Sequence, residues 1–258
     1  MTATLRKILV IDIGGSHVKL LATGQRRPVK IVSGPTMTPT EMVAAVREAA
    51  ARWQYDFVSI GYPGPVVSDA PVSEPVHLGS GWVGFEYAAA FERLVKIRND
   101  AAMQALGGYH GGRMLFLGLG TGLGSAIIME GHLQPLELAH LPYKKKRTFE
   151  EYLGEEARKK RGNVRWQRNV LDVATRLKAA MQVEYLLIGG GNVRHMRDLA
   201  GHLPKGMRLG GNADAFRGGM RLWMTPEERI KAGHRPPAVS RAKPAIVSIG
   251  ADITPHLE

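Results

Sequence analysis

The 258-residue sequence contains no cysteine, which excludes disulfides, thiolate zinc sites and cysteine nucleophiles and fits a reducing compartment. Long apolar runs are also missing, because no stretch approaches the roughly 20 apolar residues that a membrane helix needs. The first such run, residues 8–11, is interrupted by Asp12 and is too short for the core of a signal peptide. These absences predict a cytoplasmic protein.

Acidic residues are outnumbered, since 35 Lys and Arg against 23 Asp and Glu give a formal net charge of +12. Half of this excess lies in residues 144–168, where ten basic and four acidic side chains leave +6. Such a concentration favours a polyanionic partner through counterion release and long-range steering. A solvated helix in which Glu residues balance Lys and Arg is the alternative.

Two stretches follow the same plan of strand, glycine-rich turn and strand. The first has strands over 5–11 and 18–21 around Gly14-Gly15-Ser16, and the second has strands over 114–119 and 125–129 around Gly120–Gly124. This internal repeat indicates two related α/β lobes.

Helices and further strands are expected between and after these hairpins. Thr38 is a predicted N-cap and Glu41 closes a capping box for an amphipathic helix that runs to Trp53. The other expected elements are strands over 57–60, 94–97 and 185–188 and helices over 101–106 and 170–181. From residue 224 the helical periodicity fades into Pro, Arg and Lys, which predicts a mobile tail over 224–258.

The first glycine turn has the residue types that a phosphate site needs. Two glycines allow close approach of a phosphate and their N–H groups form an anion-binding nest. Asp12 can hold a metal ion, while Ser16 and Lys19 can reach phosphate oxygens. A plain hairpin turn is the structural alternative.

The second glycine turn, Gly120-Thr121-Gly122-Leu123-Gly124, is a weaker signal. Three alternating glycines in a hairpin are entropically costly unless the backbone must approach something closely. For this segment taken alone, a tight turn without a ligand is the better interpretation.

Asn99 and Asp100 stand where a strand meets a helix. The Asp100 carboxylate can accept the proton of an attacking hydroxyl, and Asn99 can hydrogen-bond a sugar. Either residue can instead simply cap the helix that begins at Ala101. Glu137 and His140 form a further polar pair, although a single His in such a place is more often structural.

Taken together, the order of these motifs is specific. The glycine hairpin, Gly61-Tyr62-Pro63-Gly64, Asn99-Asp100, Gly120–Gly124, the Glu137–His140 motif and Gly189–Asn192 follow one another along the chain. From about Ile8 to Trp223, the sequence resembles the repressor–open-reading-frame–kinase (ROK) family of sugar kinases, and within it the branch that uses polyphosphate.

The resemblance implies a role for each motif. It implies that Asp100 is the catalytic base and that the sugar is bound by Gly64, Asn99, Glu137 and His140. It implies that phosphate and metal are bound by Asp12, Gly14, Gly15 and Ser16, and that the donor is contacted by Gly120, Thr121, Gly122, Gly190 and Gly191. Two sugar-side positions depart from the family pattern: Ala139 replaces a usual glycine, and residues 77–82 lack the sugar-contacting Asn.

A polyphosphate donor needs a cationic track that leads to the active site. The basic segment follows the sugar motif directly, and the track is predicted to consist of Lys144, Lys145, Lys146, Arg147, Lys159, Lys160 and Arg161.

We therefore expect an α/β protein of two actin-like (ribonuclease-H-like) lobes with an interlobe active-site cleft. The lobes are predicted over 1–98, completed by a helix over 211–223, and over 99–210. The expected function is phosphoryl transfer from polyphosphate or ATP, with Mg²⁺, to a hexose hydroxyl, and a homodimer is a family-based expectation. The alternatives are a non-catalytic sugar or polyanion sensor and, on charge alone, a nucleic-acid binder.

Overall fold

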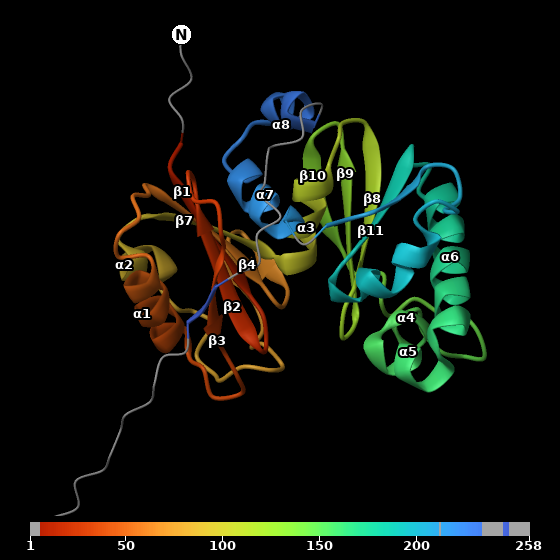
Figure 1. Cartoon of the computed structure of the whole chain (residues 1–258), viewed down its shortest axis with the longest axis horizontal. Helices are drawn as coiled ribbons and strands as arrows, with labels where there is room; N and C mark the ends of the chain where they lie inside the picture. The colour runs from red at the N-terminus through yellow and green to blue at the C-terminus, as the bar shows by residue number, and fades with distance from the viewer. Residues whose placement is uncertain (1–5, 212, 234–244, 248–258) are drawn as a thin grey trace, which may run out of the picture. The chain divides into compact units, whose positions relative to one another are not determined.

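The computed structural model describes residues 6–211, 213–233 and 245–247. Within these residues the chain forms two compact units, one of residues 6–97 with 245–247 and the other of residues 98–233 (Figure 1). None of the helices in the described part of the chain is long and apolar enough to cross a membrane.

The first unit is built on a six-stranded sheet with the order β13-β3-β2-β1-β4-β7. Its strands are β1 (Ile8–Ile13), β2 (His17–Ala22), β3 (Val29–Val32), β4 (Phe57–Tyr62), β7 (Leu94–Asn99) and β13 (Ala245–Val247). The β1–β2 hairpin is antiparallel and pairs Asp12 with Lys19, whereas β1 and β4 are parallel. The predicted first hairpin is therefore confirmed.

Helix α1 (Pro39–Ala49) packs its apolar face on this sheet, and α2 (Tyr87–Phe91) lies beside it (Figure 1). The predicted capping box is present, because Glu41 N–H donates to Thr38 Oγ1 and Thr38 N–H donates to Glu41 Oε2. Met42, Val43 and Val46 are buried from this helix. Two short strands, β5 (Val66–Val67) and β6 (Ala70–Pro71), form a separate ribbon.

The second unit repeats the strand arrangement of the first. Its strands are β8 (Arg113–Leu119), β9 (Leu123–Met129), β10 (His132–Leu136), β11 (Tyr185–Gly189) and β12 (Met207–Leu209). Their order, β10-β9-β8-β11-β12, matches β3-β2-β1-β4-β7 strand for strand, and the glycine turn joins the first two strands in each sheet. The predicted internal repeat is confirmed.

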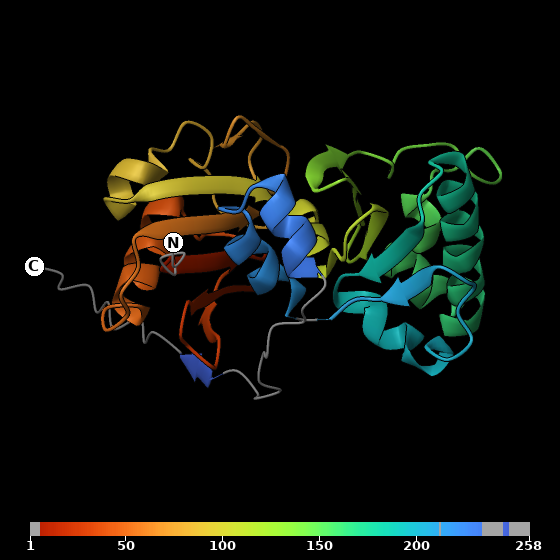
Figure 2. The same cartoon turned by 90° about the horizontal axis from the view of Figure 1, so that it is seen from above.

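Helices cover both faces of this second sheet (Figures 1 and 2). On one face α4 (Glu150–Leu153), α5 (Glu155–Arg161) and α6 (Asn163–Ala180) share a core with alternate β8 residues such as Leu115 and Leu117. The other face carries α3 (Asp100–Gly108) and α7 (Asp214–Arg221). A 3₁₀ segment, Gly191–Leu199, follows β11.

Helices α3 and α7 cross at glycines. A Cβ atom on Gly107 would lie 1.8 Å from the Asp214 carbonyl oxygen, and one on Gly218 would lie 1.7 Å from that of Met103. The buried Arg221 guanidinium also donates to the carbonyl oxygens of Leu106, Gly107 and Tyr109 at the end of α3. Helix α7, which corresponds to the helix predicted over 211–223, therefore groups with the second unit, whereas the prediction placed it with the first lobe.

The prediction of a mobile tail from residue 224 is wrong for its first part, because Pro226–Gly233 forms helix α8. Thr225 and Glu228 make a capping box, the same Thr-Pro-x-Glu signal that begins α1. Arg229 ties α8 down by donating to the carbonyl oxygens of Gly131, Arg221 and Leu222. The rest of the predicted tail, apart from β13, lies outside the described residues.

Candidate active site

The first glycine turn combines a carboxylate with backbone donors. Asp12 lies near the end of β1, and its Oδ2 is 3.0 Å from Lys19 Nζ on the paired strand, with 13% of the Asp12 side chain exposed. Gly14 N–H closes the turn on the His17 carbonyl, whereas the Gly15 and Ser16 amides have no acceptor among the described residues. The turn thus presents two backbone donors beside one carboxylate.

Gly15 is required by its surroundings. A Cβ atom there would lie 2.7 Å from the Cβ atom of His77, so the loop after β6 lies directly against the turn. The Glu74 carboxylate fixes that loop by accepting from the amides of Trp82 and Val83. Gly64, two residues after β4, is also restricted to glycine by a close neighbour, because a Cβ atom there would lie 2.9 Å from the Tyr62 ring.

The second glycine turn is held from three sides. Gly120 O accepts from Asn192 Nδ2 at 2.9 Å, the Leu123 amide donates to Glu150 Oε2 at 3.0 Å, and Thr121 O accepts from the Glu155 amide at 3.1 Å. The Thr121 and Gly122 amides have no acceptor within the described part of the chain. This turn is therefore a preorganised pair of donors, like the first one.

Sequence reasoning missed Glu150 and Asn192, the two side chains that position this turn. A Cβ atom on Gly122 would lie 2.3 Å from Glu150 Oε2, so the glycine makes room for that carboxylate. Gly190 has a φ of +83°, and a Cβ atom there would lie 2.4 Å from the Leu119 carbonyl oxygen. Since Asn192 follows two residues later, the Gly189–Asn192 stretch was the available signal.

Asn99 and Asp100 begin helix α3. Asn99 Oδ1 accepts from the amides of Ala101 and Ala102, so Asn99 is an N-cap as the structural alternative supposed. Asp100 is half-buried, and its Oδ1 accepts from the Ala101 amide at 2.7 Å. The positive end of the helix dipole favours an anionic carboxylate at this position.

The start of α3 lies against the second hairpin. A Cβ atom on Gly124 would be 2.5 Å from the Cβ atom of Ala101, and one on Gly118 would be 3.7 Å from it. The third glycine of the Gly120–Gly124 motif therefore lets the helix that begins with Asp100 approach the glycine turn.

Glu137 and His140 come together after β10. Their side chains are 70% and 74% exposed, and His140 Nε2 lies 4.0 Å from Glu137 Oε1. Between them Ala139 is buried, and its carbonyl oxygen accepts from the Glu150 amide. Glu150 thus joins the polar pair to the glycine turn.

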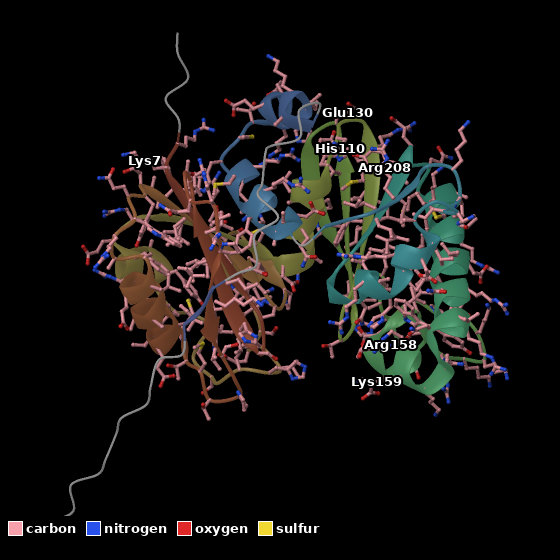
Figure 3. The ribbon with its side chains drawn as sticks, in the orientation of Figure 1. Lys7, His110, Glu130, Arg158, Lys159 and Arg208 are labelled. Carbon is pink, nitrogen blue, oxygen red and sulfur yellow. The ribbon has the colours of Figure 1, made fainter. Side chains whose placement is uncertain are left out.

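Two lysines of the predicted cationic track have acidic partners. Lys144 Nζ lies 3.1 Å from Asp172 Oδ2, and Lys159 Nζ lies 3.7 Å from Glu155 Oε1. Glu155 also forms a bidentate pair with Arg158, at 2.7 and 3.0 Å (Arg158 and Lys159 are labelled in Figure 3). Lys145 and Lys146, both with positive φ, form the exposed tip of a turn.

The remaining three cations of the track meet the second glycine turn. Arg147, Lys160 and Arg161 line a pocket of about 360 Å³ together with Thr121 and the carboxylates of Glu150, Glu151 and Glu156. The Arg161 guanidinium lies 4.1 Å from the centre of the Tyr152 ring, and its buried Nε has no hydrogen-bond partner among the described atoms. The pocket therefore joins the basic segment to the turn.

The carboxylates of two of these ion pairs, Glu155 and Asp172, are expected to make the stability of the fold sensitive to acid. The Arg158 hydrogen bonds lower the pKa of Glu155 to about 2, and the hydrogen bond from Tyr143 lowers the pKa of Asp172 to about 2. Groups with depressed folded-state pKa values stabilise the fold above their unfolded pKa, and that contribution is lost as the pH falls toward 2.

We expect the melting temperature of the protein to fall steeply between about pH 5 and pH 2. A Glu155→Gln/Asp172→Asn variant should be less stable than wild type at neutral pH, and its melting temperature should change less between about pH 5 and pH 2. Melting temperatures measured by circular dichroism at each pH test this, and parallel profiles would show that the two carboxylates do not cause the acid sensitivity.

Among the described residues, the chain offers carboxylates for a divalent metal ion that is shared with a substrate, rather than a complete metal site. No group of three or more His, Cys, Asp or Glu residues that could hold a metal occurs in the described residues. Mg²⁺ commonly uses one or two carboxylates together with substrate phosphates and water. Asp12 can supply one carboxylate of such a set, in exchange for its contact with Lys19.

No protein-family model matches the chain, but its sequence is similar to those of several known proteins. It is 28% identical over 202 residues to the polyphosphate glucokinase of Mycobacterium leprae, a match that spans 70% of this chain and 62% of that protein. The chain thus spans less than two thirds of that relative. The polyphosphate glucokinase of Mycobacterium tuberculosis H37Rv has the same identity, and 76% of its length is covered.

Solved structures share the fold. The inorganic polyphosphate/ATP-glucomannokinase of Arthrobacter sp. strain KM has a TM-score of 0.67 at 23% identity, covering 83% of this chain and 97% of that one. A ROK family protein of Streptococcus pneumoniae in complex with sucrose has a TM-score of 0.69 at 16% identity, covering 86% and 99%. A ROK family transcriptional regulator has a TM-score of 0.63 at 14% identity, covering 89% and 80%.

The chain has the actin-like α/β fold of the ROK sugar kinases, which confirms the predicted fold class. Its sequence is similar to those of the polyphosphate glucokinases, as its motifs predict.

Proposed function

We propose that the chain is a hexose kinase that transfers a phosphoryl group from polyphosphate or ATP to a hydroxyl of a glucose-like sugar. The observation that carries the proposal is the 28% identity to polyphosphate glucokinases over 202 residues. The two preorganised glycine turns supply the backbone donors that phosphoryl transfer requires. A cytosolic location stays a prediction.

On the donor side, amide groups bind the phosphate oxygens. In the part of the chain that the structure describes, the amides of Gly15 and Ser16 in the first turn have no internal acceptor, and neither do those of Thr121 and Gly122 in the second. Asp12 would hold Mg²⁺, and the ion would supply charge neutralisation for the donor phosphates. The family roles implied for Gly14, Gly120, Gly190 and Gly191 belong to this donor side, as does the phosphate contact expected of Lys19.

On the acceptor side, Asp100 is the base. The carboxylate takes the proton of the sugar hydroxyl while the hydroxyl oxygen forms a bond to the terminal phosphorus of the donor. The bridging P–O bond breaks, and a polyphosphate shorter by one unit, or ADP, leaves. Asn99, Glu137, His140 and Gly64 bind the sugar.

Polyphosphate is the favoured donor because cations continue from the second turn. Arg147, Lys160 and Arg161 line the pocket beside Thr121, and Lys145 and Lys146 lie next to Arg147 in the chain. A polyanion interacts with such a series of cations over several phosphate units, whereas ATP ends after three. ATP is the second choice.

The experiment is a coupled assay of hexose phosphate formation with each donor over glucose, mannose, N-acetylmannosamine and fructose. An Arg147→Gln/Lys160→Gln/Arg161→Gln variant should raise KM for polyphosphate at least about tenfold and weaken its salt dependence. KM for ATP should change much less. A variant with Arg26, Arg27 and Lys205 changed to Gln loses the same charge elsewhere and serves as the control. Equal effects of the two variants would contradict a local track.

Gly124→Ala tests the link between the second hairpin and Asp100. The new methyl group would lie 2.5 Å from the Ala101 Cβ atom, so the start of α3 must move. A displacement near 1 Å at a catalytic group costs up to about 100-fold in rate. We expect kcat to fall about 10- to 100-fold with donor KM little changed, and an unchanged kcat would show that this contact does not position the base.

A sensor of the same fold is the second candidate, because a ROK family transcriptional regulator shares the fold and the sugar-side motif carries Ala139. Isothermal titration calorimetry that shows hexose binding, together with no product under either donor, would favour this candidate.

A further inference from the structure

A second concave site lies in the first unit, at the end of strand β1 opposite to the first glycine turn. A pocket of about 470 Å³ is lined by Lys7, Arg47, Trp53, Tyr55, Asp56 and Arg93. Lys7 directly precedes β1, whereas Gly14 directly follows it, so a strand of six residues, about 20 Å long, separates the two places (Lys7 is labelled in Figure 3). This pocket is therefore not part of the donor site.

Three cations from three segments converge on this pocket, against a single lining carboxylate, Asp56. Lys7 Nζ donates to Gln54 Oε1 at 2.8 Å, and Arg93 donates to the backbone carbonyl oxygens of Tyr55 and Glu92. An ammonium has three N–H donors and a guanidinium five, so both groups have more donors than these acceptors use. The pocket thus carries spare donors as well as positive charge.

Arg47 is the third cation. It donates to the Ala90 carbonyl and to the Glu92 carboxylate at 3.2 Å, an exposed pair of small energetic value. The C-terminus of α1 also faces this region and brings negative partial charge. Capping that helix end does not explain the cations, because none of their hydrogen bonds given above goes to a carbonyl of the last turn of α1.

Aromatic side chains complete the pocket. Trp53 and Tyr55 are both half-buried, and the Arg93 guanidinium lies 6.0 Å from the centre of the Tyr55 ring. Arginine and lysine bind phosphate through charge-assisted hydrogen bonds, and flat aromatic faces suit a sugar or base ring. The volume lies in the range of small-molecule sites.

We propose that this pocket binds a phosphate group, either as inorganic phosphate or as the phosphate of a sugar ester. Lys7, Arg47 and Arg93 hold the phosphate, and Trp53 and Tyr55 lie against the ring of an ester. Phosphate binding here stands independently of the proposed kinase activity. Only the further step, that the kinase product is a ligand, rests on that proposed function.

The test is a titration of the full chain with inorganic phosphate and, separately, with glucose 6-phosphate, at constant ionic strength. Binding is followed by calorimetry and by tryptophan fluorescence, in which Trp53→Phe identifies the reporting residue. The affinity should fall at least about tenfold in Lys7→Gln/Arg93→Gln, whereas Arg52→Gln, a cation near the end of α1 that does not line the pocket, should leave it unchanged. Tighter binding of the ester than of phosphate would assign a role to the aromatic rings, and equal binding would limit the site to the phosphate group.

Two results would overturn the proposal. One is the absence of saturable binding of either ligand to the wild-type chain, with folding verified by circular dichroism. The other is binding that Lys7→Gln/Arg93→Gln leaves intact and Arg147→Gln/Lys160→Gln/Arg161→Gln removes, which would place the ligand at the donor pocket. Failure of the kinase proposal is a separate observation, namely no hexose phosphate from either donor, and leaves the phosphate titration unaffected.

Discussion

Asp100→Asn is expected to lower kcat by about two to four orders of magnitude while the affinities for hexose and donor stay within a few-fold of wild type. An amide of the same shape can keep the hydrogen bond from the Ala101 amide but cannot take up the hydroxyl proton. General-base catalysis is worth about 100- to 10,000-fold, which sets the size of the loss. Steady-state kinetics with calorimetric titrations of each ligand measure it.

Asn99→Ala is the comparison for this variant. It removes the oxygen that accepts from the Ala101 and Ala102 amides, so it should cost about 1 kcal/mol of stability. Asp100→Asn leaves that cap in place and should melt within a few degrees of wild type. Turnover near the wild-type level in Asp100→Asn would remove Asp100 from the role of base.

Gly218→Ala is expected to give the largest loss of stability among single methyl additions. The new Cβ atom would lie 1.7 Å from the Met103 carbonyl oxygen and 3.0 Å from the Gly107 backbone nitrogen, so helices α3 and α7 must separate. Overpacking of this kind costs roughly 3 kcal/mol or more, which corresponds to a fall in melting temperature of about 6–12 °C for a protein of this size.

Gly201→Ala is the matched control, because nothing lies within 4 Å of a Cβ atom at that exposed position. Thermal unfolding followed by circular dichroism compares the two variants. If Gly218→Ala melted like Gly201→Ala, the close crossing of the two helices would be wrong. Because α3 begins with Asp100, we also expect Gly218→Ala to lose activity below its melting temperature.

Local signals made much of the fold predictable from the sequence. The glycines at residues 14–15 and 120–124 marked both hairpins, and Thr38 with Glu41 marked the start of α1. The repeated order of hairpin and strand gave two related sheets. Each of these features is encoded within a few consecutive residues, which a pattern in one sequence can show.

Other features depend on contacts between distant residues. Glu150 lies 27 residues from the amide of Leu123 that it accepts from, and Asn192 lies 72 residues from Gly120. No local pattern assigns Glu150 to the turn, and the Gly189–Asn192 stretch marks Asn192 only as part of a glycine-rich motif, without naming its partner. The placement of α7 likewise depends on Gly107 and Gly218, each of which meets backbone atoms of the other helix. The capping signal of Thr225 at the start of α8, in contrast, is local and was overlooked.

Phosphorus NMR of the purified full chain with glucose, Mg²⁺ and polyphosphate tests the central claim most directly, since it follows the phosphoryl group itself. We predict that a phosphate monoester signal grows as the end-group signal of the polymer changes, and that Asp100→Asn produces no such signal in the same time. Two results would contradict the proposal of a hexose kinase. One is a wild-type spectrum in which only inorganic phosphate is formed, and the other is a spectrum that does not change with polyphosphate or with ATP.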